Sequence, residues 1–136
     1  MSNSEQTLSI IKPDAVERNL EGTIVDIFVK SGLKIINKRK LHISKEEASN
    51  FYEVHQSKPF FNDLCNYLSS GPIIVMILEG VNAVKKNREL MGATDPKIAE
   101  PNTIRKLYGI SIDKNSVHGS DSIDNAKIEI DFFFKD

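Results

Sequence analysis

The chain has 136 residues, of which 40% are apolar and 27% charged, as expected of a soluble globular protein with one hydrophobic core. Its formal net charge of −1 argues against a dedicated nucleic-acid binder, so positive charges that bind a ligand must be gathered locally. Cys65 is the only cysteine, which excludes an intrachain disulfide. No apolar run approaches the ~20 residues that span a bilayer, and the first residues are polar. We therefore expect one domain (residues 1–136), no membrane association and a cytoplasmic location.

The first half of the chain contains two predicted strands, each followed by a helix. Residues 7–11 form an apolar strand that must end before Pro13, because proline cannot donate to a ladder. Apolar residues then recur at helical spacing as far as Gly32, which is typical of a helix end. A second strand covers residues 33–41. The sequence Ser-Lys-Glu-Glu at 44–47 has the form of a capping box and opens the next helix.

The second half begins with a helical stretch at residues 59–68. Residues 73–78 are continuously apolar, as in a strand that is buried on both faces. Asn82 is expected to cap the helix that follows. Residues 93–115 then form a long irregular stretch, and a loop of that length in a compact domain usually has a function.

The order of the elements predicts the fold. A short central strand at residues 117–119 follows the long loop, and Ile123 to Phe133 lie at helical spacing. The pattern fits an α+β fold close to the ferredoxin-like βαββαβ arrangement. We expect a four-stranded antiparallel sheet covered by helices on one face.

The segment 115–122, Asn-Ser-Val-His-Gly-Ser-Asp-Ser, carries the strongest chemical signal. Imidazole is nucleophilic near pH 7, so His118 could hold a phosphoryl group covalently. Gly119 has no side chain and would leave room for such a bulky reactant. Glu129 is the candidate partner for the other ring nitrogen, although an exposed helix carboxylate is at least as good an interpretation.

Several residues outside this segment could bind phosphate. Lys12 follows the first strand, Arg88 precedes the long loop, and Thr94 and Arg105 lie within it. Each alone is more simply a surface residue, and Lys12 could equally belong to a plain turn. Together they could balance the charge of a nucleoside triphosphate.

Two further positions allow more than one interpretation. Phe60 and Phe61 are most simply core residues, yet one ring could face outward and stack on a base. His55 is either a polar neighbour of the site or a phosphate contact. The sequence has no protein-held metal motif, but Mg²⁺ could arrive bound to nucleotide phosphates.

Nearly the whole chain resembles the nucleoside diphosphate kinase family. The resemblance is carried by ordered motifs of several residues each: Ile-Lys-Pro-Asp-Ala at 11–15, Arg-Asn at 18–19, Pro-Phe-Phe at 59–61, Ser-Gly-Pro at 70–72, Met-Gly-Ala-Thr at 91–94, Thr-Ile-Arg at 103–105 and the segment 115–122.

The resemblance implies a two-step transfer of the γ-phosphoryl group of a nucleoside triphosphate, usually ATP, to a nucleoside diphosphate. His118 would carry the group on Nδ1, while Glu129 holds the other nitrogen and Ser120 lies beside the pair. The remaining site residues are implied by position: Lys12 and Asn115 for ribose and phosphate, Tyr52 close to His118, Arg88, Thr94 and Arg105 for phosphate, and Phe60 with Leu64 for the base.

The resemblance also implies Mg²⁺ as cofactor and a homo-oligomer, either a tetramer or a hexamer. Stacking does not distinguish the bases, so broad base and sugar tolerance is expected. The chain departs from the common pattern at Asn102, where glycine is usual, at Leu107, where aspartate is common, and at Lys58, where arginine is frequent. These departures concern loop stability and subunit contacts more than the reaction.

Two other functions fit parts of the sequence. A ferredoxin-like RNA-binding module needs aromatic residues on its sheet, and the strands at 7–11 and 73–78 have none. A phosphohistidine phosphatase or mutase pairs its histidine with an adjacent arginine motif, which is missing around His118.

Overall fold

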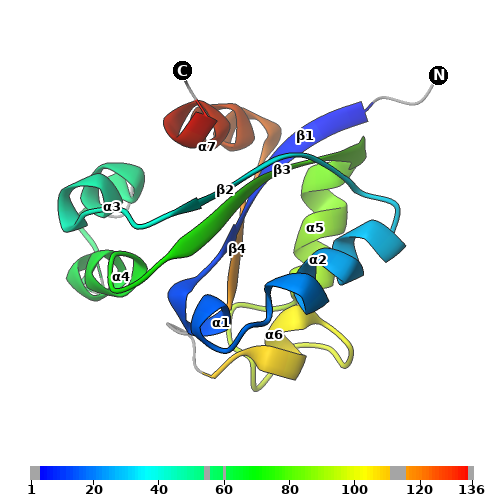
Figure 1. Cartoon of the computed structure of the whole chain (residues 1–136), viewed down its shortest axis with the longest axis horizontal. Helices are drawn as coiled ribbons and strands as arrows, with labels where there is room; N and C mark the ends of the chain where they lie inside the picture. The colour runs from blue at the N-terminus through cyan, green and yellow to red at the C-terminus, as the bar shows by residue number, and fades with distance from the viewer. Residues whose placement is uncertain (1–3, 54–55, 60, 111–115, 135–136) are drawn as a thin grey trace.

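A computed structural model describes residues 4–53, 56–59, 61–110 and 116–134. Strands and helices alternate along these residues (Figure 1). In chain order they are β1 (Ser4–Ile11), α1 (Pro13–Glu17), α2 (Glu21–Lys30), β2 (Lys34–Leu41), α3 (Lys45–Phe51), α4 (Phe61–Leu68), β3 (Ile73–Val81), α5 (Ala83–Met91), α6 (Ile104–Tyr108), β4 (Val117–Gly119) and α7 (Ile123–Phe134).

The four strands form one antiparallel sheet in the order β2-β3-β1-β4, which confirms the ferredoxin-like α+β prediction. The expectation that residues 117–119 form a central strand is wrong. Among the described residues, β4 pairs only with β1, through Ser9–Ile11, and lies at the edge of the sheet. A strand of three residues carries little sequence signal about how many strands lie beside it.

Helices cover both faces of the sheet, so the expectation of one covered face is also wrong (Figure 1). On β1, Leu8 and Ile10 pack in a core with α3, α4 and α7. Ile11 belongs to a second core, which includes residues of α2, α5 and α6. Residues Thr7 to Ile11 are therefore all buried, which accounts for the uninterrupted burial at the end of this strand.

Local sequence signals set most helix ends. The capping box of α3 forms as expected, with Glu47 N donating to Ser44 Oγ at 3.1 Å and Ser44 N donating to Glu47 Oε1 at 3.0 Å. Gly32, just after α2, has φ +96°, a conformation that favours glycine. Pro13 opens α1, a short helix that the sequence pattern did not reveal.

The start of α5 differs from expectation. Asn82 stands at the N-cap position, but its backbone is left-handed and its side chain makes no capping hydrogen bond. Instead Glu5, on β1, accepts a hydrogen bond of 3.0 Å from Val84 N. A carboxylate near this helix start also complements the helix dipole. The first residues of β1 thus hold α5 against the sheet.

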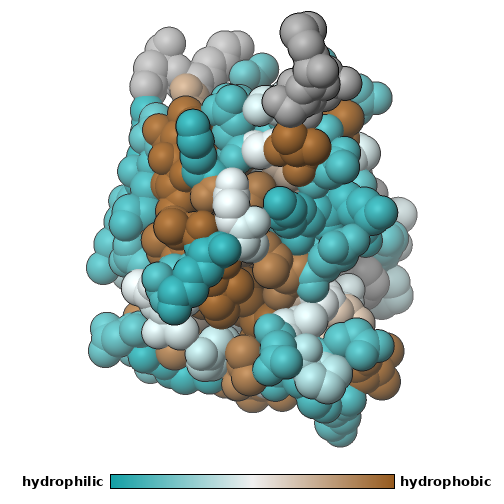
Figure 2. All heavy atoms as spheres, turned by 90° about the vertical axis from the view of Figure 1, so that its right-hand side faces the viewer, coloured by the Kyte–Doolittle hydropathy of each residue, from teal (hydrophilic) through white to brown (hydrophobic). Residues whose placement is uncertain are grey.

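The face that Figure 2 shows carries a band of apolar side chains bordered by polar ones. Within the described part of the chain, no helix is long and apolar enough to cross a membrane.

Candidate active site

The structure brings His118, Ser120 and Glu129 together where β4 meets α7. His118 Nε2 lies 3.0 Å from Glu129 Oε1, and Ser120 Oγ donates to the same oxygen at 2.7 Å. The Ser120 hydroxyl also accepts a hydrogen bond of 3.3 Å from Leu8 N, which ties it to β1. Both side chains of the His118–Glu129 pair are about four-fifths buried, with 21% and 19% exposed. The geometry supports Glu129 as a partner of the imidazole rather than as a surface carboxylate.

The same geometry defines the tautomer of His118. An ionised carboxylate can only accept hydrogen bonds, so Nε2 carries the proton that is donated to Glu129. In the neutral ring this leaves a lone pair on Nδ1. Nδ1 is thus the ring nitrogen that the bond to Glu129 leaves available.

Gly119 serves a purpose that the sequence did not suggest. A Cβ at this position would fall against Asn87 Nδ2 and lie 2.7 Å from Met91 Cε, both on α5. Asn87 and Met91 are themselves buried. The absence of a side chain lets α5 pack directly behind the strand that carries His118. Helix packing therefore favours glycine here, in addition to the space it leaves beside His118.

A Gly119→Ala variant is expected to be destabilised by about 1–3 kcal/mol, because the new methyl group overpacks two buried side chains. Thermal unfolding would measure the change. Gly22→Ala is the matched control, since a Cβ at this helical position meets nothing within 4 Å. The control should be as stable as the original or slightly more so. Equal stability of the two variants would contradict the packing account.

Arg105, on α6, is a buried link between the loop and β4. Its Nη1 donates to Gly92 O at 3.1 Å and its Nη2 to Val117 O at 2.9 Å, next to His118. Its Nε is buried and has no hydrogen-bond partner. Burial, followed by the positive charge of Arg88, lowers the pKa of Arg105 to about 10. The guanidinium remains charged at neutral pH.

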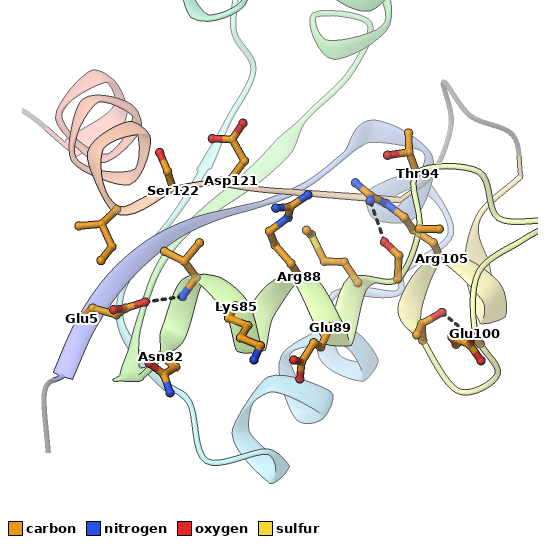
Figure 3. Close-up of a pocket in the computed structure, with 16 residues that line it drawn as sticks. Glu5, Asn82, Lys85, Arg88, Glu89, Thr94, Glu100, Arg105, Asp121 and Ser122 are labelled. Atoms are coloured by element: carbon orange, nitrogen blue, oxygen red, sulfur yellow. Dashed lines mark hydrogen bonds between the residues drawn. The ribbon is translucent and has the colours of Figure 1, made fainter.

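A cavity of about 880 Å³ lies along α5. Arg88, Thr94 and Arg105 line it, as expected for residues that bind one ligand together. In Figure 3 the Arg88 guanidinium points away from α5, toward the region where Asp121 lies. Thr94 lies beside Arg105. His118 does not line this cavity. Arg105 connects the two parts of the site, because it lines the cavity and bonds to the residue before His118.

Tyr52 and Lys12 are buried close to the same region. Burial raises the pKa of Tyr52, and the charges of Cys65 and Glu129 act in the same direction, against that of Arg105. The phenol therefore keeps its proton and remains a hydrogen-bond donor. Lys12 caps α1, and its backbone N–H donates to Ser116 O at 2.8 Å.

Leu64, on α4, packs at the edge of the core that contains α3 and α7. Three other expected site residues lie outside the described residues: His55, Phe60 and Asn115.

Arg18 has a role that sequence reasoning missed. Its Nη2 donates to Asp14 Oδ2 at 3.0 Å, to Tyr108 O at 2.6 Å and to Ser116 Oγ at 3.2 Å. Arg18 thus joins α1 to residues before and after segment 111–115. The only sequence signal was the Arg-Asn motif at 18–19, which gave no hint of these partners.

Asn102, where the family pattern has glycine, has φ +70°. This left-handed conformation favours glycine, and asparagine is among the residues that tolerate it best. The substitution therefore preserves the backbone of the loop. Leu107, the second departure, is half exposed on α6.

The described residues contain no group of three or more His, Cys, Asp or Glu that could hold a metal ion.

Comparison with known proteins identifies the family. The model of the family described as nucleoside diphosphate kinase matches residues 5–136. The nucleoside diphosphate kinase of Nitratiruptor sp. is 61% identical over 130 residues, which cover 96% of this chain and 95% of that protein. The enzyme of Wolinella succinogenes is 59% identical with the same coverage.

Solved structures agree. The nucleoside diphosphate kinase of Aquifex aeolicus superposes with a TM-score of 0.94 at 42% identity, covering 97% of this chain and 96% of the other. That of Halobacterium salinarum, solved in complex with CDP, gives 0.94 at 41% identity, with coverage of 98% and 90%.

Fold, site and relatives together define a phosphotransferase that acts on nucleotides. The chain belongs to the nucleoside diphosphate kinase family. It transfers the γ-phosphoryl group of a nucleoside triphosphate to nucleoside diphosphates in two steps, through the phosphohistidine intermediate general to this family.

Proposed function

We propose that His118 is the residue that carries the phosphoryl group in this exchange. The observation that carries the proposal is the hydrogen bond from Nε2 to Glu129, which leaves the Nδ1 lone pair available. Nδ1 attacks the γ-phosphorus, the bond from phosphorus to the bridging oxygen breaks, and the diphosphate leaves with the electron pair. An oxygen of the acceptor diphosphate then attacks the same phosphorus, and the P–N bond breaks.

Glu129 stabilises the ring during both steps. When Nδ1 bonds to phosphorus, the ring gains positive charge, which the carboxylate at Nε2 offsets. Ser120 keeps Glu129 in place, because its hydroxyl donates to the oxygen that also accepts from His118.

Arg88, Thr94 and Arg105 hold the phosphates of the nucleotide. All three line one cavity, and the Arg105 Nε is buried without a partner. An arginine donor that is buried and unpaired suits an anionic ligand. Lys12 and Tyr52 complete the site, with Tyr52 as a protonated donor near the reacting groups.

An Arg105→Lys variant tests whether Arg105 binds the phosphates of the nucleotide. An ordinary lysine titrates near ~10.4, and the burial that lowers the pKa of Arg105 would also lower the pKa of a lysine at this position. We expect the KM for ATP to rise with pH below ~10.4, because the lysine loses its proton and its charge.

The original enzyme should not show this effect, since Arg105 keeps its proton up to about pH 10. Arg88→Lys is the control, because Arg88 is exposed and a lysine there stays charged. Identical pH profiles for the two variants would contradict the proposed binding of phosphate by Arg105.

The base and sugar contacts rest on the family resemblance. Phe60 would stack on the base with Leu64 beside it, Asn115 would bind ribose and phosphate, and His55 would lie near phosphate. Stacking accepts every base, because each has a π-face.

Mg²⁺ is the proposed cofactor, bound to the nucleotide phosphates. The described residues offer no metal cage, which suits an ion that enters with its ligand. When bound, it would neutralise part of the phosphate charge.

We also propose a cytoplasmic, single-domain protein that forms a homo-oligomer, a tetramer or a hexamer. Large apolar side chains are exposed, including Val29 on α2, Ile36 on β2 and Ile110 after α6, and such surface often marks subunit contacts. Light scattering should give the mass of four or six chains; the mass of one chain would contradict the proposal.

Initial-rate kinetics test the proposed reaction. With ATP and a second diphosphate varied together, double-reciprocal plots should be parallel, because one product leaves before the acceptor binds. Intersecting lines would mean that both nucleotides must be bound before transfer, and the proposed phosphohistidine route would fail.

A further inference from the structure

Phe51 packs against the ring of His118. It is the last residue of α3, and its ring centroid lies 5.3 Å from that of His118 at an interplanar angle of 75°. This edge-on arrangement is a favoured geometry for two aromatic rings. Phe51 is half buried and packs at the edge of the core between α3, α4 and α7.

Phe51 is itself held by the ring of Tyr52, which follows α3, and by two rings of α7. Its centroid lies 5.1 Å from that of Tyr52, 5.6 Å from that of Phe132 and 5.1 Å from that of Phe133. Phe132 and Phe133 belong to α7, the helix that also supplies Glu129. Phe51, which contacts His118, is therefore packed against α7, the same helix that carries Glu129.

The hydrogen bond to Glu129 does not by itself fix the imidazole plane. The χ2 torsion of histidine has broad minima. Nε2 lies nearer than Nδ1 to the axis of the Cβ–Cγ bond, so a χ2 rotation moves Nε2 less than it moves Nδ1. The bond at Nε2 can survive a rotation that turns Nδ1 away from a phosphorus atom.

The contact with Phe51 supplies the missing restraint, because a ring packed edge-on against the imidazole limits rotation in its direction. The capping box sets the residue at which α3 begins. In a helix this short, the starting residue also determines the side of the helix on which Phe51 lies. Ala48, one turn earlier, is fully buried on the same face and keeps α3 close to the core.

We propose that Phe51 is a positioning residue that holds the His118 ring so that Nδ1 faces the γ-phosphorus of the donor. The inference rests on the proposed role of His118 as phosphoryl carrier. It adds a second restraint, from α3, to the one that Glu129 provides from α7.

A Phe51→Leu variant tests the proposal, since leucine keeps the apolar packing and removes the ring. In rapid single-turnover measurements with ATP, we expect phosphoenzyme formation to slow by about 10- to 100-fold, because near-attack geometry is lost. The KM for ATP should change by no more than about twofold, because Phe51 is not assigned to nucleotide binding. Phe51→Tyr keeps the ring and should restore a rate within about threefold of the original.

Phe134→Leu is the matched control. Phe134 also lies on α7 and packs at the edge of the same core, and its ring centroid lies 4.9 Å from Arg39 Cζ. Its variant should lower the unfolding temperature as Phe51→Leu does, while phosphoenzyme formation stays near the original rate. Equal rates for Phe51→Leu and the original enzyme, or equal losses of rate in Phe51→Leu and Phe134→Leu, would overturn the proposal.

The test separates this inference from the function on which it rests. If the original enzyme forms no phosphoenzyme at His118, the carrier role fails. If it does, and the Phe51→Leu variant forms it as fast, only the positioning role fails.

Discussion

Replacing His118 by glutamine is expected to lower phosphoryl exchange by ~10⁴-fold or more and to abolish phosphoenzyme formation, because no other group replaces the nucleophile. Glutamine fills much of the same space and can still donate to Glu129, so the fold should persist. Incubation with γ-labelled ATP should leave label on the original protein that is lost in acid, stable in alkali and removed by any nucleoside diphosphate.

The control for this variant is His42→Gln. His42 Nε2 lies 3.0 Å from Ser69 O at an exposed position after β2, and nothing links it to the proposed site. Its variant should label and exchange like the original. Labelling of the His118→Gln variant to the same extent as the control would refute the assigned nucleophile.

Replacing Glu129 by glutamine is expected to slow phosphoenzyme formation by about 100-fold, as for the loss of a charge-assisted hydrogen bond of ~3 kcal/mol. The amide keeps the size of the carboxylate but not its charge, so the ring loses stabilisation as Nδ1 bonds to phosphorus. The same oxygen also accepts from Ser120, and this bond is weakened at the same time. The KM for ATP should change little, since Glu129 does not line the cavity.

Single-turnover rates would measure this loss, with Asp131→Asn as control. Asp131 is an exposed carboxylate on the same helix, so its variant removes the same charge from α7 without touching His118. If the two variants react equally fast, the carboxylate does not act through the imidazole.

The sequence predicted those features that depend on neighbours along the chain. The capping box at Ser44, the helix end at Gly32 and the end of β1 before Pro13 all follow from local rules, and the structure confirms them. The number and antiparallel arrangement of the strands were also correct.

Features that depend on tertiary neighbours were not predictable in this way. Residues 117–119 were expected to form a central strand, but so short a segment does not show how many strands lie beside it, and β4 lies at the edge. The apolar run in β3 did signal burial on both faces, although helices were expected on only one face of the sheet.

The candidate site shows the same division. The pairing of His118 with Glu129 could not be decided from residues eleven positions apart, since it depends on how α7 packs against β4. The sequence singled out Gly119 for the space it leaves, but Asn87, whose packing also favours glycine there, lies on α5. Phe51 gave no chemical signal, because a phenylalanine at a helix end is most simply part of a core.

The most direct test of the account is the position of the phosphate on the modified enzyme. Nuclear magnetic resonance of isotope-labelled phosphoenzyme would show which nitrogen couples to phosphorus. The account predicts coupling to Nδ1 of His118, with Nε2 still protonated and bonded to Glu129. Coupling to Nε2, or a phosphate on any other residue, would contradict it.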